Sequence, residues 1–228
     1  MPSKFIKQDT KFLAEVEKAI KSEIKRRNFC FGHEVFNIKH LTECPRRISY
    51  RAHGFDTKKT PETQIFLADR DLKYTKKKWV ELFSQIPNIV VIDTNILAAD
   101  ANFNISGTVD AIIKCGSWVG ALMVDVVDAE NYAKAKETGG LRRQIVEVMT
   151  AAWLVEVPNG ILLCENRVTN EYFFSHVIAH PPVIRGVKDK CRRLMQQQIL
   201  QQLPDKPYKD DSSKECQVCE YRKTCWKT

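Results

Sequence analysis

The sequence predicts an α/β fold that ends in a cysteine-rich tail. Apolar residues recur at helical spacing early in the chain, β-branched stretches with a glycine-containing turn follow, and helical spacing returns later. No glycine-rich phosphate loop connects a strand to a helix, which argues against a doubly wound fold. The chain has 228 residues, 43% of them hydrophobic, so it can bury one large core.

Two helices and three strands are expected in the first part of the chain. Apolar residues from Phe12 to Ile24 recur every three or four positions and predict a helix over 10–27. A second helix is predicted over 62–85. Three strands are predicted over 87–102, 105–117 and 120–129, the last two forming a hairpin.

The second part of the chain is expected to be helix, strand pair and helix. Helical spacing returns after Gly140, a strand–turn–strand unit is predicted over 160–177, and a long helix over 184–199 stops before Pro204. The predicted organisation has three parts: an N-terminal helical region over 1–86, a core over 87–203, and a linker with a cysteine segment over 204–228.

From charge and hydropathy we expect an anionic partner and no membrane anchor. The net charge is +8, from 36 Lys and Arg against 28 Asp and Glu, which suits a nucleic acid. No apolar run approaches the roughly 20 residues of a membrane-spanning helix, and the N-terminus lacks the apolar centre of a secretory signal. We therefore expect a cytoplasmic protein, in the host cytoplasm if the source is viral.

The eight cysteines fall into two groups by spacing. Four stand alone and are expected to be small buried apolar residues: Cys30, Cys115, Cys164 and Cys191. Three form C-x2-C-x5-C in the tail, namely Cys216, Cys219 and Cys225. A tail this short buries little surface, so a metal is expected to order it, with Cys44 as the candidate fourth ligand. Spacing leaves open zinc, an iron–sulfur cluster, a zinc knuckle completed by histidine, and a redox-active C-x2-C pair.

"CPRR" at 44–47, taken with the terminal cysteine pattern, resembles the iron–sulfur branch of the PD-(D/E)XK nuclease superfamily. This RecB/AddB-like branch includes the AddB-type helicase–nucleases and the CRISPR-associated iron–sulfur exonucleases with their phage-type relatives. The resemblance implies a restriction-endonuclease-like core, with a mixed central sheet flanked by helices. It also implies a [4Fe–4S] cluster that clips the C-terminal tail to the N-terminal helical region through Cys44, Cys216, Cys219 and Cys225.

The family pattern also predicts the catalytic residues. "SGTVDAII" places Asp110 on one strand, "MVDVVD" places Asp125 on the next, and "LRRQIVEVM" places Gln144 on the following helix. Carboxylates on adjacent strands, with the Val126 carbonyl as a further oxygen ligand, suit Mg²⁺ or Mn²⁺. Such a metal polarises the scissile phosphate and lowers the pKa of a bound water. A carboxylate within an apolar strand, as Asp125 is, otherwise costs stability.

Three positions depart from the family pattern. Val127 stands where the pattern has a lysine that orients water and stabilises charge on the phosphate. Lys134 is the candidate for a migrated lysine, with Lys136 as the other. The helix over 62–85 lacks the metal-binding histidine of the family, and Val148 replaces a tyrosine.

The predicted function is an iron–sulfur-containing, Mg²⁺- or Mn²⁺-dependent DNA exonuclease that acts on ends or single strands, weakened by the lost lysine. Its predicted phosphate contacts are Arg46, Arg47, Arg142 and Arg143. The alternative is a catalytically inactive nuclease-fold module that binds DNA or a partner protein, and a homo-oligomer is left open. A third reading is a zinc-clipped structural protein unrelated to nucleases.

Overall fold

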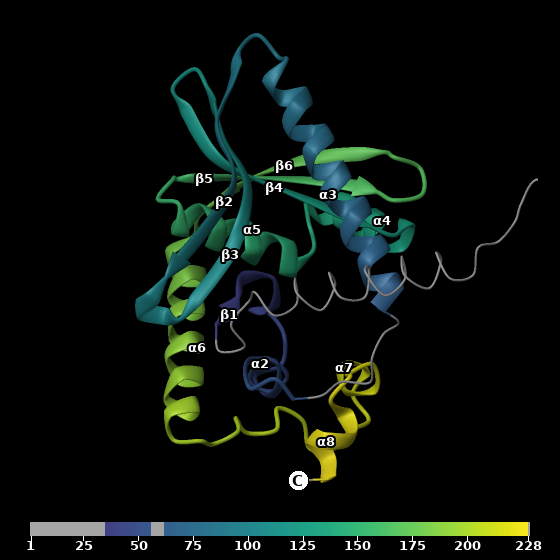
Figure 1. Ribbon diagram of the computed structural model, residues 1–228, viewed down its shortest axis with the longest axis vertical. Helices are drawn as coiled ribbons and strands as arrows, with labels where there is room; N and C mark the ends of the chain where they lie inside the picture. The colour runs from purple at the N-terminus through teal and green to yellow at the C-terminus, as the bar shows by residue number, and fades with distance from the viewer. Residues whose placement is uncertain (1–34, 56–61, 228) are drawn as a thin grey trace, which may run out of the picture.

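The computed structural model describes residues 35–55 and 62–227 of the chain, and these form a mixed sheet with helices on both faces (Figure 1). The predicted helix over 10–27 lies outside the described residues. The strands are β1 (Phe36–Asn37), β2 (Ile89–Asp100), β3 (Ile105–Cys115), β4 (Trp118–Val127), β5 (Asn159–Asn166) and β6 (Tyr172–Ile178). The α-helices are α2 (Pro45–Ala52), α3 (Glu62–Ser84), α4 (Ala129–Thr138), α5 (Arg142–Leu154), α6 (Pro181–Ile199), α7 (Lys214–Gln217) and α8 (Arg222–Lys227). Two short 3₁₀ helices are η1 (Ile38–His40) and η2 (Ala101–Phe103).

The sheet has the order β1-β3-β4-β5-β6, with β2 paired to β3. The pairs β2/β3, β3/β4 and β5/β6 are antiparallel, whereas β4/β5 and β1/β3 are parallel. The parallel pair β4/β5 requires a crossover connection, which α4 and α5 supply. The predicted α/β class with a mixed, helix-flanked central sheet is confirmed.

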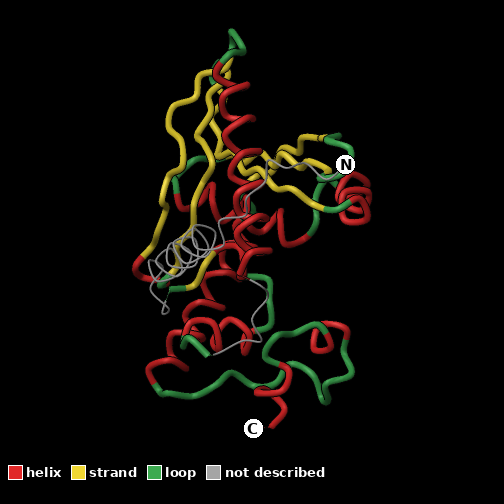
Figure 2. Tube along the Cα trace, turned by 45° about the vertical axis from the view of Figure 1, so that its right-hand side comes forward, coloured by secondary structure: helices red, strands yellow, loops and turns green. Residues whose placement is uncertain are grey.

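Each face of the sheet has its own helices because side chains alternate along β4. Leu122 and Val124 pack towards α3, against Trp79 and Phe83. Met123 and Val127 belong to the larger core, which the sheet shares with α4, α5 and α6. Figure 2 shows α3 running beside the long strands of the sheet.

β3 and β4 separate along part of their length and form a fork in the sheet. The two strands pair only from Ala111–Leu122 to Cys115–Trp118. Beyond Ala111, β3 continues against β2 while β4 continues against β5. The space between the separated strands is therefore open to side chains from both strands and from the covering helices.

The predicted second helix, the three strands of the first part and the later helix–strand–strand–helix order are all present. The sequence prediction missed α4, although its boundaries carry helix signals. Asp128 caps the first turn by accepting a hydrogen bond from the Asn131 N–H at 2.9 Å, and Gly139 ends the helix at φ 75°. Of the described helices, none combines the length and apolarity needed to cross a bilayer.

Candidate active site and cysteine cavity

Asp110 lies in the fork and is 2% exposed. One oxygen of its carboxylate accepts a hydrogen bond from the Val124 N–H at 2.7 Å. The other accepts one from the Lys76 ammonium on α3, also at 2.7 Å. A buried carboxylate needs such partners, because losing water without them is costly. Asp110 thus joins β3, β4 and α3 at one point.

Asp125 lies on β4 one residue beyond Val124 and is held by the start of α5. Its Oδ2 atom accepts hydrogen bonds from Arg143 at 3.0 Å and from the Gln144 amide at 2.8 Å. The Gln144 Oε1 atom in turn accepts from the Leu141 N–H at 2.7 Å, which fixes the orientation of the amide. The structure therefore brings Gln144 to Asp125, as the sequence predicts.

Asp125, Arg143 and Gln144 line a cavity of about 190 Å³, which we call the carboxylate cavity. Asp110 does not itself line the cavity, but it accepts hydrogen bonds from Lys76 and Val124, which both do. Further charged side chains in the wall are Lys39 from η1 and Glu147 from α5. The cavity therefore combines carboxylates with cations from three separate elements.

Glu147 has a perturbed acidity. Burial and the nearby Asp125 carboxylate raise its pKa from 4.5 to about 7, although Lys39, Lys76 and Arg143 act in the opposite direction. The sequence prediction missed this residue. Its spacing of three positions after Gln144, which places both on one face of α5, is the signal that identifies it.

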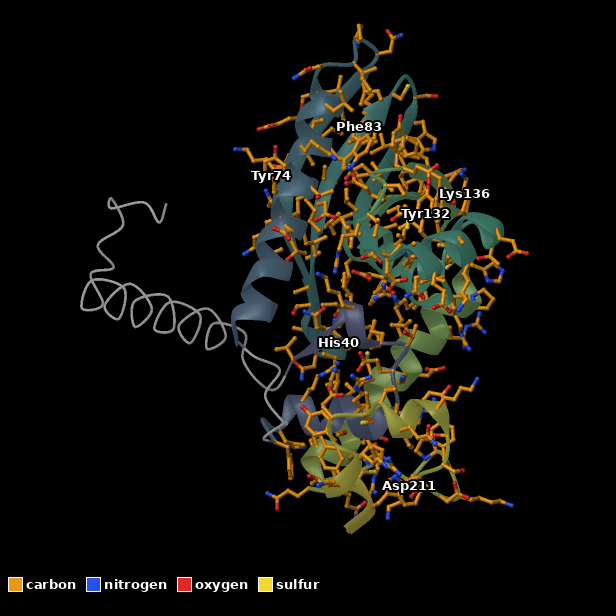
Figure 3. All side chains as sticks on the ribbon, turned by 90° about the vertical axis from the view of Figure 1, so that its right-hand side faces the viewer. His40, Tyr74, Phe83, Tyr132, Lys136 and Asp211 are labelled. Atoms are coloured by element: carbon orange, nitrogen blue, oxygen red, sulfur yellow. The ribbon has the colours of Figure 1, made fainter. Side chains whose placement is uncertain are left out.

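Val127, which replaces the motif lysine, is 4% exposed and packs in the core with Tyr132 and Ala135. Lys134, the candidate for a migrated lysine, does not line the carboxylate cavity; its exposed ammonium pairs with Glu130 at 2.6 Å. Its neighbour Lys136 lies over the Tyr132 ring (Figure 3).

Lys76 lies beside Asp110, one of the predicted catalytic carboxylates. It precedes Trp79 and Phe83 by three and seven positions, and both of these face the sheet. Helical periodicity therefore assigns Lys76 to the inner face of α3. This spacing can be read from the sequence, although the charge of the run Lys76–Lys78 by itself indicates a solvent-exposed face.

Four predicted cluster ligands surround a second cavity, of about 390 Å³: Cys44, Cys216, Cys219 and Cys225. Among the described residues, no three His, Cys, Asp or Glu side chains converge closely enough for a single metal ion. Burial raises the pKa of the Cys219 thiol. We call this space the cysteine cavity.

The C-terminal segment folds back onto α2, and α7 and α8 lie beside it in Figure 1. Glu220 pairs with Arg47 at 2.5 Å and with Arg51 at 2.6 Å. The rings of Tyr50 and Tyr221 stack at 5.2 Å between centroids. These contacts join residues that are about 170 positions apart in the sequence.

Glu43 strengthens this junction from the N-terminal side. It accepts hydrogen bonds from Arg51 at 2.6 Å and pairs with His40 at 2.9 Å. Burial alone would raise the pKa of Glu43, but the hydrogen bonds from His40 and Arg51 lower it to about 2. Glu43 is therefore ionised at neutral pH and balances the arginines of α2.

The four arginines predicted to contact phosphate lie in two places. Arg143 lines the carboxylate cavity, whereas Arg46, Arg47 and Arg142 line the cysteine cavity. Arg46 donates hydrogen bonds to the Pro204 carbonyl at 2.7 Å and the Cys225 carbonyl at 3.2 Å. A role in binding phosphate stays a prediction for all four.

The isolated cysteines differ from one another. Cys164 and Cys191 are fully buried, as predicted, and burial raises the pKa of each thiol to about 11. Cys115 is exposed at the end of β3, so its predicted burial is wrong. The strand reaches the hairpin turn there and leaves the core. Cys30 lies outside the described residues.

Comparison with known proteins identifies relatives by structure alone. No protein-family model matches the chain, and no curated protein does. The crystal structure of SSO0001 superposes with a TM-score of 0.57 and 15% identity, covering 92% of this chain and 95% of that one. The alkaline exonuclease LHK-Exo from Laribacter hongkongensis superposes with a TM-score of 0.53 and 8% identity, covering 75% of this chain and 90% of the exonuclease. Its complex with dAMP gives a TM-score of 0.52 and 9% identity over the same shares. The chain thus shares its overall fold with these structures.

Proposed function

We propose that the chain is a divalent-metal-dependent DNA nuclease, an exonuclease acting on ends or single strands, whose site lies in the fork between β3 and β4. The observation that carries the proposal is one cavity lined by Asp125, Gln144 and Lys76. Asp110 lies next to its wall and accepts a hydrogen bond from Lys76. The likeness to an alkaline exonuclease, seen also as a complex with dAMP, supports the same reading. At 8–9% identity that likeness concerns the fold, so the chemistry rests on the cavity.

The donor set fits Mg²⁺ or Mn²⁺. Asp110, Asp125 and the Val126 carbonyl offer oxygen atoms, the ligands that these ions favour. Mg²⁺ is commonly held by one or two carboxylates together with water and substrate phosphate, so a site without three converging acidic side chains is adequate. When bound, the ion supplies Lewis acidity at the phosphate and a more acidic water.

The remaining groups of the cavity have roles that follow from their contacts. Gln144 and Arg143 orient Asp125 through their hydrogen bonds. Lys76 supplies a fixed positive charge beside Asp110, where it stabilises negative charge on the phosphate. In this proposal Lys76 takes the role of the lysine that Val127 replaces.

The same proposal assigns a [4Fe–4S] cluster to the cysteine cavity. Four thiols line one cavity of about 390 Å³, and four cysteine thiolates are the usual ligands of such a cluster. Arg46 lines the wall of this cavity, and its Nη1 atom donates a hydrogen bond to Cys225 Sγ at 3.5 Å. The cluster would hold the C-terminal segment against α2.

The first experiment is a cleavage assay on end-labelled single- and double-stranded DNA, with Mg²⁺ and with Mn²⁺, using protein purified without oxygen. Activity that disappears in Asp125→Asn supports the site. Comparison of Lys76→Met with Lys134→Met identifies which lysine acts, and we expect the loss in Lys76→Met. If the intact protein binds DNA but cleaves it with neither Mg²⁺ nor Mn²⁺, the proposed nuclease activity is wrong.

The cluster has its own test. Purified protein should contain iron and acid-labile sulfide. The Cys44→Ala variant should lose both, whereas the Cys115→Ala variant should keep them, because Cys115 is exposed and does not line the cysteine cavity. Zinc without sulfide would contradict the assignment.

An inactive DNA-binding module is the second candidate, and the ion pair between Lys76 and Asp110 favours it. An ammonium 2.7 Å from a carboxylate oxygen competes with a metal for that oxygen. The cleavage assay separates the two candidates, because only the nuclease responds to Mg²⁺ or Mn²⁺.

A further inference from the structure

A groove leads away from the carboxylate cavity along α3. The cavity shares Leu72 with a neighbouring cleft of about 460 Å³, whose wall includes Val126 and Arg167. That cleft shares Tyr74 and Asn170 with another of about 500 Å³. We call the two clefts together the α3 groove.

Exposed aromatic rings line this groove or lie next to it: Tyr74 and Tyr172 line it, and Phe174 contacts Tyr172. Among the described residues, four large aromatic side chains are exposed: Phe55 at 43%, Tyr74 at 72%, Tyr172 at 52% and Phe174 at 48%. All except Phe55 lie on α3 or on the α3-facing side of β6, and Tyr74 projects from α3 in Figure 3. Exposed apolar surface gathered at one place marks a binding surface rather than scattered packing defects.

The rings on β6 are held in fixed positions. Tyr172 meets Trp79 edge-on at 4.6 Å between centroids, and Phe174 meets Phe83 at 5.9 Å. Each ring is therefore supported by α3 while part of it stays open to solvent. A rigid, partly open ring offers a face for stacking with little loss of side-chain entropy on binding.

Cationic side chains accompany the rings. Lys77 and Lys78 line the outer cleft and Arg167 lines the inner one. The Lys77 side chain is 75% exposed, and its pair with Glu81 at 3.6 Å is a weak surface pair. Lys78 pairs with the buried Glu165 at 2.9 Å, so that carboxylate is already neutralised. Asp71 and Glu81 also line the groove, so its walls carry both signs of charge. Lys77 and Arg167 are exposed near Tyr74, where the phosphates of a strand whose base stacks on this ring can reach them.

We propose that the α3 groove binds single-stranded nucleic acid, with bases stacked on Tyr74 and Tyr172 and phosphates at Lys77 and Arg167. Single strands fit because their bases are free to stack on protein rings, whereas a duplex keeps its bases stacked on one another. The groove meets the carboxylate cavity at Leu72, so a bound strand leads to Asp125. Only this last step rests on the proposed nuclease function; binding in the groove does not.

The test is fluorescence anisotropy with a labelled oligo(dT), measured without divalent metal so that no strand is cut. Tyr74→Ala should weaken binding about fivefold or more, because it removes one stacking face, whereas Tyr74→Phe keeps that face and should bind like the unaltered protein. Lys77→Ala should reduce the slope of log affinity against log salt by about 0.7, the value for one phosphate contact of a single strand. The matched control is Lys209→Ala, an exposed lysine in the linker, which should change neither quantity.

Three results would each contradict single-strand binding in the α3 groove. They are an unchanged affinity in Tyr74→Ala, an equal loss of affinity in Tyr74→Phe, and a blunt hairpin duplex that binds as tightly as oligo(dT). Oligo(U) in place of oligo(dT) separates RNA from DNA, and dependence on Tyr74 with either polymer supports the groove. The result also separates this inference from the nuclease. If binding depends on Tyr74 but no cleavage occurs, only the proposed nuclease activity is wrong. If metal-dependent cleavage occurs and is unaffected by replacing Tyr74, only the proposed binding in the α3 groove is wrong.

Discussion

The Lys76 ammonium lies 2.7 Å from the Asp110 carboxylate, although the two residues are 34 positions apart and belong to different elements. Asp110 is almost completely buried, so this ion pair is screened little by water. The ion pair holds α3 over the fork and places a cation beside Asp110. The position two residues after Asp125, where the family pattern has a lysine, is occupied by the uncharged Val127. The position of α3 is therefore part of the site as well as part of the core.

Replacing Lys76 tests this relationship directly. Lys76→Met keeps most of the apolar stem and removes the charge, so we expect cleavage to fall by about 10²-fold or more. Unfolding should become easier by about 3 kcal/mol, because Asp110 is left buried without its cation. Lys76→Arg keeps the charge and should recover most of the stability. Single-turnover cleavage and denaturant unfolding measure the two effects, and a variant that cuts at the full rate would exclude Lys76 from catalysis.

The sheet and the helices on its faces could be predicted because their signals are local. Alternation and β-branched runs mark β2 to β6, and helical spacing marks α3, α5 and α6. The pairing of Asp125 with Gln144 followed from the family pattern. Each of these features follows from short stretches of sequence, so it can be predicted without knowledge of the tertiary structure.

The composition of the carboxylate cavity could not be predicted in the same way. It depends on where β3 and β4 separate, at Ala111–Leu122, and on which turn of α3 crosses that point. Lys134 is near Asp125 in sequence, yet α4 directs it to the surface, whereas the distant Lys76 reaches the fork. Sequence proximity to Asp125 therefore does not determine which lysine lies beside a predicted catalytic carboxylate.

Glu220 should control the attachment of the C-terminal segment. It pairs with both Arg47 and Arg51, so Glu220→Gln weakens two charged contacts at once. We expect faster limited proteolysis within 204–213 and a loss of about 1–3 kcal/mol in the free energy that holds the segment in place. The matched control is Glu130→Gln, which breaks the exposed pair with Lys134 and should have little effect. Equal proteolysis of both variants would show that other contacts hold the segment.

Glu147 should make stability depend on pH. Its pKa is about 7 in the folded protein against 4.5 for a free side chain, so between these values the folded state keeps a proton that the unfolded state has lost. Stability therefore falls as the pH rises from about 4.5 to 7 and levels off above 7.

Glu147→Gln removes this titration, and its advantage over the unaltered protein should grow across the same interval to at most about 3 kcal/mol. Urea unfolding at pH 5 and at pH 8, without divalent metal, measures the change. Glu137→Gln, on the exposed side of α4, should leave the pH dependence as it is. A parallel pH dependence in Glu147→Gln and the unaltered protein would contradict the raised pKa.

The three isolated cysteines of the described chain should react with thiol reagents at very different rates. Cys115 is exposed at the hairpin turn, whereas Cys164 and Cys191 are fully buried and have thiols whose pKa is raised to about 11. Only the thiolate is alkylated, so at pH 8 the buried pair is protected both by lack of access and by protonation. Brief treatment with iodoacetamide followed by mass spectrometry should modify Cys115 alone among the three, and treatment in denaturant should modify all of them. Because Cys164 lies against Gln144 and Cys191 lies within the core face of α6, early modification of either would mean that the sheet opens locally beside the carboxylate cavity or beneath α6.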